Sequence, residues 1–143
     1  MIERSGKLLV VGTPIGNLGD LSPRAARALG QADLVAAEDT RTARALLSHL
    51  ALHKPTVSYF DGNEARRSGD LLRQLCEGKI VALISESGMP LVSDPGFRLV
   101  RACAGAGVTV EVVPGPSAAL VALVGSGLPT DQFRFLGFLP RKP

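Results

Sequence analysis

Residues 79–90 read KIVALISESGMP, and they hold the clearest strand signal of the chain directly before a polar loop. The apolar run Lys79–Ile84 has the length of a strand that is buried on both faces. The loop Ser85–Pro90 that follows combines serine, glycine and proline with one carboxylate, Glu86. In an open α/β sheet, ligands bind at the carboxyl ends of such strands. This stretch therefore predicts a buried parallel strand with a candidate site at its end.

The same alternation of strand and helix runs through the rest of the chain. We expect further strands at Lys7–Val11, Asp33–Ala37, Thr56–Phe60 and Val108–Val113, with another extended segment at Phe133–Leu139. Five helices are expected between them: from Ser22-Pro23 to Ala32, from a Thr40 cap to Leu50, from Asn63 to the Gly78 stop, from Asp94-Pro95 to Gly105, and from Ser117 to Val124. This alternation predicts a three-layer αβα domain of the α/β class, with a mostly parallel five-stranded sheet, over residues 1–139.

The composition is that of a soluble globular protein. The chain has 143 residues, of which 45% are hydrophobic and 20% are charged, and a net charge of +3 permits an anionic partner without requiring one. No signal peptide and no apolar run of membrane-spanning length is recognised, so we expect a cytoplasmic protein without a membrane segment. Cys76 and Cys103 fall within apolar helical patterns and are expected to be reduced core or near-core residues. His49 and His53 lack further ligands at metal-binding spacing, so no metal site is expected.

Unusual residues gather directly after each predicted strand. The five clusters are Gly12–Asn17, Glu38–Arg41, Asp61–Glu64, Ser85–Pro90 and Pro114–Ser117. All of them lie at one edge of the expected sheet, whereas the connections at the other edge are plainer, and this asymmetry predicts a small-molecule site. The glycine spacing does not match the dinucleotide fingerprint, and no Walker lysine follows, so nicotinamide and nucleoside triphosphate sites are disfavoured.

Each cluster also has a purely structural interpretation. Glu38 and Asp39 suit an acid/base pair, but taken alone a helix N-terminal charge or an ion pair with Arg41 explains them better. Glu86 suits either a hydrogen bond to a ligand or the ordering of its own loop. The many arginines suit phosphate binding, or they form an ordinary solvated basic surface.

Taken in order, these clusters resemble a known family. The motifs are Thr13–Leu18 (TPIGNL), Ala37–Arg41 (AEDTR), Asn63-Glu64, Ser93–Gly96 (SDPG), Pro114–Ala118 (PGPSA), Gly127–Pro129 (GLP) and Gly137–Pro140 (GFLP). The chain resembles the N-terminal domain of the bacterial 16S ribosomal RNA cytidine-2'-O-methyltransferases, within the tetrapyrrole (corrin/porphyrin) methylase superfamily. It departs from that pattern where the family usually has SDAGTP and HDHNE, since this chain has Ser85–Pro90 (SESGMP) and Phe60–Glu64 (FDGNE).

The resemblance implies an enzyme of two domains with its cofactor, S-adenosylmethionine, in the cleft between them. Residues 140–143 would then begin a linker to a C-terminal domain that this chain lacks, so the fragment is not expected to methylate RNA alone. The implied partners are 16S rRNA in the 30S subunit and a second copy of the protein in a homodimer.

The resemblance also assigns expected roles to residues. The residues that match cofactor-binding positions are Pro14, Glu86, Met89, Ser117 and Ala118. The candidates for a catalytic base or orienting carboxylate are Asp39, Glu38 and Glu86, of which the motif favours Asp39 and Glu38. Arg41 and Arg44 lie three residues apart on one expected helix near the same edge, so they are the candidates for holding RNA phosphate. Two other functions remain open: a tetrapyrrole (precorrin or porphyrin) C-methyltransferase domain, and a non-catalytic RNA-binding or cofactor-binding fragment.

Overall fold

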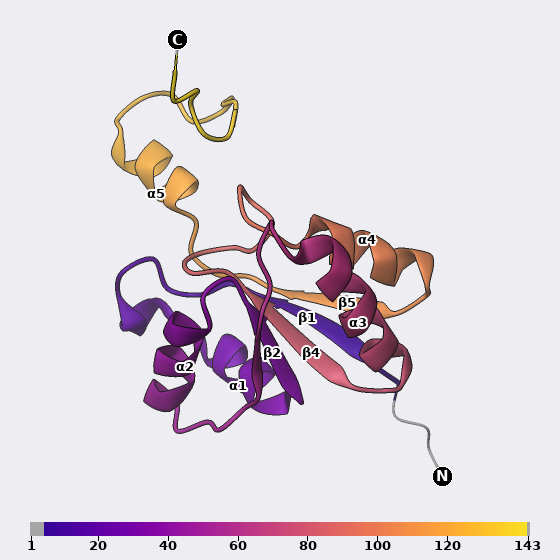
Figure 1. The fold of residues 1–143 in the computed structure, drawn as a ribbon. Coiled ribbons are helices and arrows are strands. Elements are labelled where there is room, and N and C mark those ends of the chain that lie inside the picture. The colour runs from indigo at the N-terminus through magenta and orange to yellow at the C-terminus, as the bar shows by residue number, and fades with distance from the viewer. Residues whose placement is uncertain (1–4, 143) are drawn as a thin grey trace.

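Five parallel strands form one sheet in the computed structural model, which describes residues 5–142 (Figure 1). The strands are β1 (Lys7–Val11), β2 (Leu34–Ala37), β3 (Thr56–Ser58), β4 (Ile80–Ile84) and β5 (Thr109–Val113). Their order across the sheet is β3-β2-β4-β1-β5, and every neighbouring pair is parallel. Strand β4, which lies within residues 79–90, is therefore the central strand of the sheet. Its Ala82 is in register with Leu9 of β1 and with Val35 of β2.

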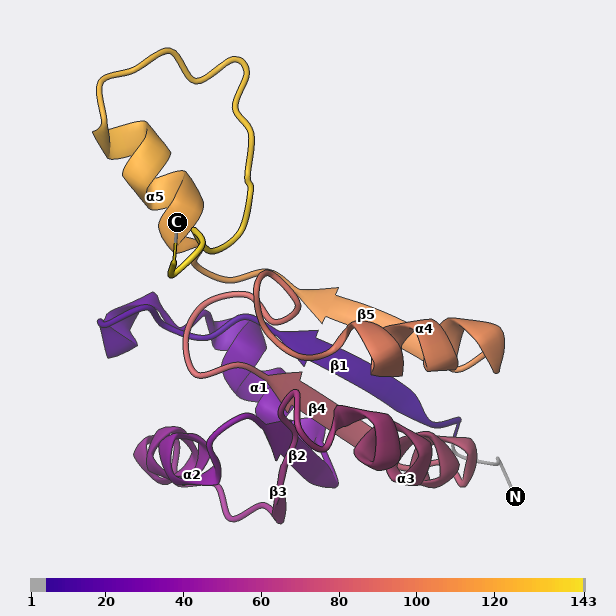
Figure 2. The ribbon, with the colours of Figure 1, turned by 45° about the horizontal axis from the view of Figure 1, so that its top comes forward.

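Four helices cover the sheet in two layers, which confirms the predicted three-layer α/β fold. The helices of the chain are η1 (Leu18–Asp20), α1 (Pro23–Gln31), α2 (Thr40–His49), α3 (Glu64–Cys76), α4 (Phe97–Gly105) and α5 (Ala118–Gly125). Figure 2 shows α1 and α2 on one face of the sheet and α3 and α4 on the other. Because side chains alternate along a strand, Leu9 and Val11 of β1 join the core under α1 and α2, whereas Leu8 and Val10 join the core under α3 and α4.

The helix starts follow local capping chemistry. Ser22 caps α1 as predicted, since its hydroxyl accepts a hydrogen bond from the Ala25 N–H at 3.0 Å and Pro23 occupies the first turn. The cap of α2 is Asp39, not Thr40 as the sequence suggested. Asp39 still has extended backbone from the end of β2, and its carboxylate accepts from the Arg41 N–H at 2.8 Å.

Two other predictions about elements are wrong. Helix α4 begins at Phe97, not at Asp94-Pro95, because Gly96 has a φ of 141° and Ser93 a φ of 60°, and neither conformation is helical. The segment Phe133–Leu139 forms no strand in the described part of the chain, and every one of its side chains is exposed.

The two cysteines differ in environment. Cys103 is buried in the core beneath α3 and α4, as predicted. Cys76 is exposed, because it is the last residue of α3 and falls outside the buried stripe that Leu71 and Leu75 form. In residues 5–142, no helix combines the length and the apolar character needed to cross a membrane.

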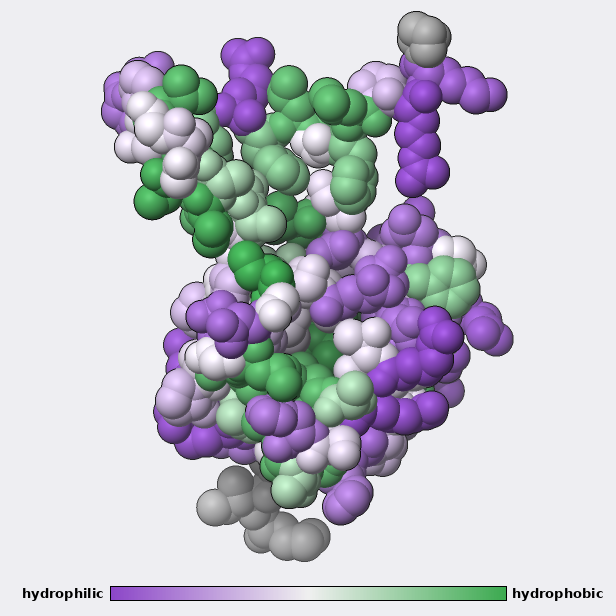
Figure 3. Space-filling view, turned by 90° about the vertical axis from the view of Figure 1, so that its left-hand side faces the viewer, coloured by the Kyte–Doolittle hydropathy of each residue, from purple (hydrophilic) through white to green (hydrophobic). Residues whose placement is uncertain are grey.

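Helix α5 and the segment after it stand away from the three layers (Figures 1 and 2). No residue of α5 is buried, although its sequence is almost wholly apolar. Figure 3 shows hydrophobic residues gathered on this projecting part. The large apolar side chains exposed there are Leu120, Val121, Val124, Leu128, Phe133, Phe135, Leu136, Phe138 and Leu139.

Candidate functional site at the carboxyl edge of the sheet

The loops after β1, β4 and β5 are joined to one another by hydrogen bonds that backbone N–H groups donate. Thr13 and Gly88 form an antiparallel bridge, with N···O distances of 3.0 and 3.1 Å between their backbones. The Gly12 N–H donates to the Val113 carbonyl at 3.0 Å, and the Gly115 N–H donates to the Met89 sulfur at 3.2 Å. Three of the five clusters that the sequence singled out therefore form one connected structure.

Two glycines make this close approach possible. A Cβ atom on Gly12 would lie 2.5 Å from Gly115 Cα and 2.7 Å from the Met89 sulfur. A Cβ atom on Gly115 would in turn lie 2.6 Å from Gly12 Cα. Since real side chains do not fit in such gaps, these positions require glycine, and the site depends on backbone packed against backbone.

Residues of the joined loops line two cavities. The first encloses about 310 Å³ and is lined by Thr13, Pro14, Gly16, Asn17, Leu18, Thr42, Ala43, Ala45, Leu46, Ile84, Ser85 and Glu86. The second encloses about 400 Å³ and is lined by Ile15, Ser87, Gly88, Met89, Val92, Ser93, Asp94, Ser117, Ala118, Ala119, Phe135, Gly137 and Phe138. Both volumes lie in the range of small-molecule sites.

The five residues matched to cofactor positions do not surround a single cavity. Pro14 and Glu86 line the first, whereas Met89, Ser117 and Ala118 line the second. All five nevertheless lie at the same edge of the sheet, as expected from the ends of the strands. The second cavity also takes part of its wall from the apolar segment after α5, through Phe135 and Phe138.

Carboxylates from three loops lie near one another at this edge. Burial raises the pKa of Glu38, and the negative charges of Asp94, Glu86 and Asp61 raise it further. The pKa of Asp94 is raised in the same way, mainly by burial and then by Glu86. Glu38 and Asp94 are therefore the two carboxyl groups of this edge whose pKa is raised towards the range that proton transfer requires, and Glu38 is the one of the two that the sequence motif singled out.

Asp39 has a different environment. It caps α2 and forms an ion pair with Arg41, whose Nη2 lies 2.7 Å from Oδ2. These hydrogen bonds to Arg41 lower the pKa of Asp39 to about 2. A carboxylate so strongly stabilised in its charged form is a poor proton acceptor, and its observed role is to cap and pair.

The two arginines expected to hold RNA phosphate are exposed residues of α2. The Arg41 side chain is 87% exposed, and it neutralises Asp39. Arg44 is exposed and lines a separate cavity of about 380 Å³ together with His53 and Lys54. Within residues 5–142, no three His, Cys, Asp or Glu side chains are grouped so that they could hold a metal ion.

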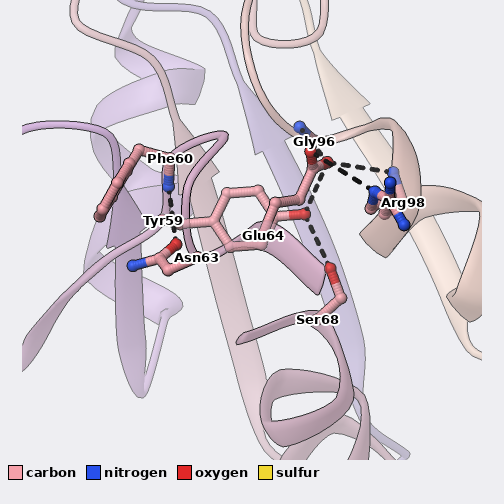
Figure 4. A network of polar contacts seen from close by, with 7 residues as sticks. All are labelled: Tyr59, Phe60, Asn63, Glu64, Ser68, Gly96 and Arg98. Atoms are coloured by element: carbon pink, nitrogen blue, oxygen red, sulfur yellow. Dashed lines mark hydrogen bonds and ion pairs between the residues drawn. The ribbon is translucent and has the colours of Figure 1, made fainter. Parts of the chain in front are cut away.

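A buried polar network links the β3–α3 and β4–α4 loops (Figure 4). The Tyr59 hydroxyl lies 2.9 Å from the Ser68 hydroxyl and donates to Glu64 Oε1 at 3.1 Å. The same oxygen of Glu64 accepts from the backbone N–H groups of Gly96 and Arg98, at 3.1 and 3.3 Å. Glu64 thus supplies the start of α4 with the cap that its own N-cap residue, a glycine, cannot provide.

Reasoning from the sequence missed this network. It placed Glu64 in the cluster after β3, but nothing in the sequence indicated that its partner is a helix 32 residues further along the chain. The one available signal was Tyr59, the only tyrosine of the chain, at the end of an apolar strand, where a buried hydroxyl requires a polar partner.

The chain is similar in sequence to a family of known proteins. Residues 7–140 match the family model of the tetrapyrrole (corrin/porphyrin) methylases. The ribosomal RNA small subunit methyltransferase I of Xylella fastidiosa is 50% identical over 138 residues, which cover 96% of this chain and 50% of that protein. The enzyme of the same name from Thermotoga maritima is 48% identical, over 95% of this chain and 61% of that protein. The corresponding Escherichia coli O157:H7 protein is 47% identical, over 96% and 48%.

A solved structure shows the same fold. The uroporphyrin-III C-methyltransferase of Thermus thermophilus superposes with a TM-score of 0.64 and is 31% identical, over 87% of this chain and 53% of that one. The chain therefore spans about half the length of the curated relatives and of the solved structure that it matches.

Proposed function

The chain belongs to the tetrapyrrole (corrin/porphyrin) methylase family, and on this premise we propose that it is half of an S-adenosylmethionine-dependent methyltransferase acting on ribosomal RNA. The reaction would place a methyl group on the 2'-oxygen of a cytidine ribose in 16S rRNA of the 30S subunit. The observation that carries the proposal is identity of 47–50% to proteins named ribosomal RNA small subunit methyltransferase I, across 95–96% of this chain.

The residues at the carboxyl edge suit a flat, partly apolar cofactor. The second cavity offers the thioether of Met89, the backbone of Ser117-Ala118 and the positive-φ turn at Gly88. Pro14 and Glu86 would close the site from the first cavity, next to it. When bound there, S-adenosylmethionine would supply an electrophilic methyl group carried on a cationic sulfonium.

The protein's own contribution would be to orient the ribose hydroxyl and to take its proton. Glu38 is the candidate for the proton acceptor, because it is partly buried, its pKa is raised and it lies among other carboxylates at the carboxyl edge of the sheet. Asp39, the other candidate, would act on the reaction mainly by fixing the start of α2 and holding Arg41.

The remaining features belong to the whole protein. We assign residues 1–139 to the N-terminal domain and 140–143 to the start of a linker, of which Pro143 lies outside the described residues. A second domain would cover the apolar surface of α5 and the segment after it. Arg41 and Arg44 would contact RNA phosphate, and the enzyme would work as a homodimer in the cytoplasm, where 30S subunits are found.

A second candidate function has its own support. The solved structure that the chain superposes on is named a uroporphyrin-III C-methyltransferase, so a tetrapyrrole acceptor uses the same fold. Identity to that protein is 31%, against 47–50% to the ribosomal RNA enzymes, and this difference favours the RNA substrate.

A transfer assay separates the candidates. The complete protein that contains this chain is incubated with radiolabelled S-adenosylmethionine and with either 30S subunits from a strain that lacks the gene or uroporphyrinogen III. We expect label in 16S rRNA, at a cytidine ribose when the RNA is digested and analysed by mass spectrometry. Label in the tetrapyrrole and none in 30S subunits would reverse the choice. Binding of RNA or cofactor without transfer to either acceptor would favour a non-catalytic domain.

The assignment of the proton acceptor is tested by a pair of isosteric variants. Glu38→Gln removes the basic carboxylate with little change in shape, and we expect kcat to fall by about 10²-fold or more with KM nearly unchanged. Asp39→Asn is the matched control, because asparagine also caps helices and the native carboxylate is a weak base; its kcat should stay within about threefold. Equal losses in the two variants would remove Glu38 from its assigned role.

A further inference from the structure

Two arginines of α4 line a groove between the first turns of α3 and α4. Arg98 and Arg101 lie three residues apart, so their side chains share one face of the helix. The groove has a volume of about 600 Å³, and its walls are Ala65, Phe97, Arg98, Arg101 and Ala102. It lies on the α3–α4 face of the sheet, opposite to the face that α2 covers with Arg41 and Arg44 (Figure 2).

The positive charge of this groove is largely uncompensated. The Arg98 side chain is 65% exposed, and among the described residues its ion-pair partner is Glu64, whose Oε2 lies 3.9 Å from Arg98 Nε. The other oxygen of Glu64 already accepts three hydrogen bonds. Arg101 is exposed and forms no ion pair with any described residue. The same is true of Arg66, in the first turn of α3.

Helix stability does not account for these arginines. The first turn of a helix favours negative charge, and the last turn favours positive charge. Helix α4 has the opposite arrangement, with Arg98 in its first turn, no acidic residue there and no basic residue in its last turn. A ligand of negative charge explains this placement, because the two arginines attract it. The helix start itself is already capped by Glu64, which accepts from the N–H groups of Gly96 and Arg98.

An exposed aromatic ring lies beside the arginines. Phe97, the first residue of α4, is 63% exposed and lines the same groove. Arginines that hold phosphates next to an aromatic face on which a base stacks are the elements of a single-stranded nucleic-acid site. Glu64 fixes this arrangement, since it holds the backbone N–H of Arg98 at 3.3 Å (Figure 4).

We propose that the groove between α3 and α4 binds single-stranded RNA, with Arg98 and Arg101 on phosphates and Phe97 against a base. This inference rests on the proposed function and deepens it. It adds a second contact surface for the RNA substrate, on the sheet face opposite to Arg41 and Arg44.

Binding of a fluorescein-labelled 20-nucleotide RNA of mixed sequence to the chain, measured by anisotropy over a salt series, tests the proposal. Each lost phosphate contact lowers the slope of log affinity against log salt by about 0.7, which is about fivefold in affinity at 0.1 M salt. The double variant R98Q/R101Q should therefore bind about 25-fold more weakly, with a slope smaller by about 1.4. Phe97→Ala should lose about fivefold or more in affinity at an unchanged slope, because stacking releases no counterions.

The control is R27Q/R73Q, which removes two exposed arginines outside the groove: Arg27 on α1, and Arg73 near the far end of α3, where it pairs with Asp70 at 2.8 Å. It should bind within about threefold of the unchanged chain, and thermal melts should show all variants folded. Equal weakening in R98Q/R101Q and R27Q/R73Q would overturn the proposal. So would competition by polyglutamate as strong as that by unlabelled RNA, since the groove would then be a general anion surface.

The two proposals fail separately. If the unchanged complete protein methylates 30S subunits but R98Q/R101Q binds RNA like its control, the groove assignment is wrong and the function stands. If RNA binding depends on the groove but 16S rRNA receives no methyl group, the function is wrong and the groove stands.

Discussion

Tyr59 shows at the residue scale how one buried hydroxyl stabilises this protein. Its side chain is 1% exposed, and it joins Ser68 to Glu64. Tyr59→Phe removes both hydrogen bonds and leaves the Ser68 hydroxyl without its partner, so the free energy of unfolding should fall by about 2 kcal/mol at pH 7. Urea unfolding of the variant and the unchanged chain measures this difference.

The same residue predicts a dependence on pH. Burial raises the pKa of Tyr59 to about 12, whereas an unfolded chain has the ordinary value of about 10. The neutral phenol therefore contributes stability that is complete below about pH 10 and is lost as the pH rises towards about 12. The stability difference between the unchanged chain and Tyr59→Phe should shrink over that range. A difference that stays constant would show that Tyr59 ionises alike in the folded and unfolded chains.

Residue identities were easier to predict than residue roles. The motifs correctly indicated that the clusters around Glu38 and Glu86 gather at one edge of the sheet. They did not show that Asp39 is engaged in a helix cap with Arg41, because a carboxylate before a helix suits either catalysis or capping. The carboxylate partners that raise the pKa of Glu38 come from separate loops, so only the folded chain reveals them.

At the scale of elements, the junction of β1 and β5 gives the sharpest prediction. Gly12→Ala would place a Cβ 2.5 Å from the backbone of Gly115, so the two loops must separate, at a cost of about 2–3 kcal/mol. Gly105→Ala is the control: this position lies in α4 with no atom within 4 Å of the added Cβ. That variant should be neutral or up to about 1 kcal/mol more stable. Thermal unfolding distinguishes the two, and a Gly12→Ala chain as stable as the control would disprove the close packing.

Strands were predicted better than the ends of helices. The buried strands are recognisable in the sequence as short apolar runs, and all five lie within a few residues of their expected bounds. The start of α4 was placed too early, because a proline after Asp94 is as common in the first turn of a helix as in a loop. The helix starts later because the backbone of Gly96 is not helical. A Cβ atom at this position would lie 2.5 Å from the Leu91 side chain, and the residues next to Gly96 in the sequence do not indicate this close approach.

At the scale of the whole molecule, the sequence predicted the three layers, but it did not predict that the apolar helix α5 would stand outside them (Figure 1). Alternating periodicity fixes which strand faces meet which helices, so the three-layer order followed directly. Helix α5 was recognised as apolar, but only the structure shows that its side chains find no partner in the described chain. An exposed apolar helix next to a ligand cavity is the property expected of one wall of a site shared with a second domain.

The proposed second domain predicts a substitution whose effect depends on the length of the chain. Val124 on α5 is 77% exposed here, so Val124→Asp should change the stability of the 143-residue chain by less than about 0.5 kcal/mol. In the complete protein the same aspartate would be buried against the second domain without a partner, at a cost of about 3 kcal/mol or more. Gln31→Asp is the control, because it adds the same charge at an exposed polar position at the end of α1, away from α5, and its effect should be the same in both proteins. Melting temperatures of the four variant proteins decide the matter: if Val124→Asp is as harmless in the complete protein as in this chain, then α5 does not face the second domain, and the cavity lined by Met89 and Ala118 is not completed there.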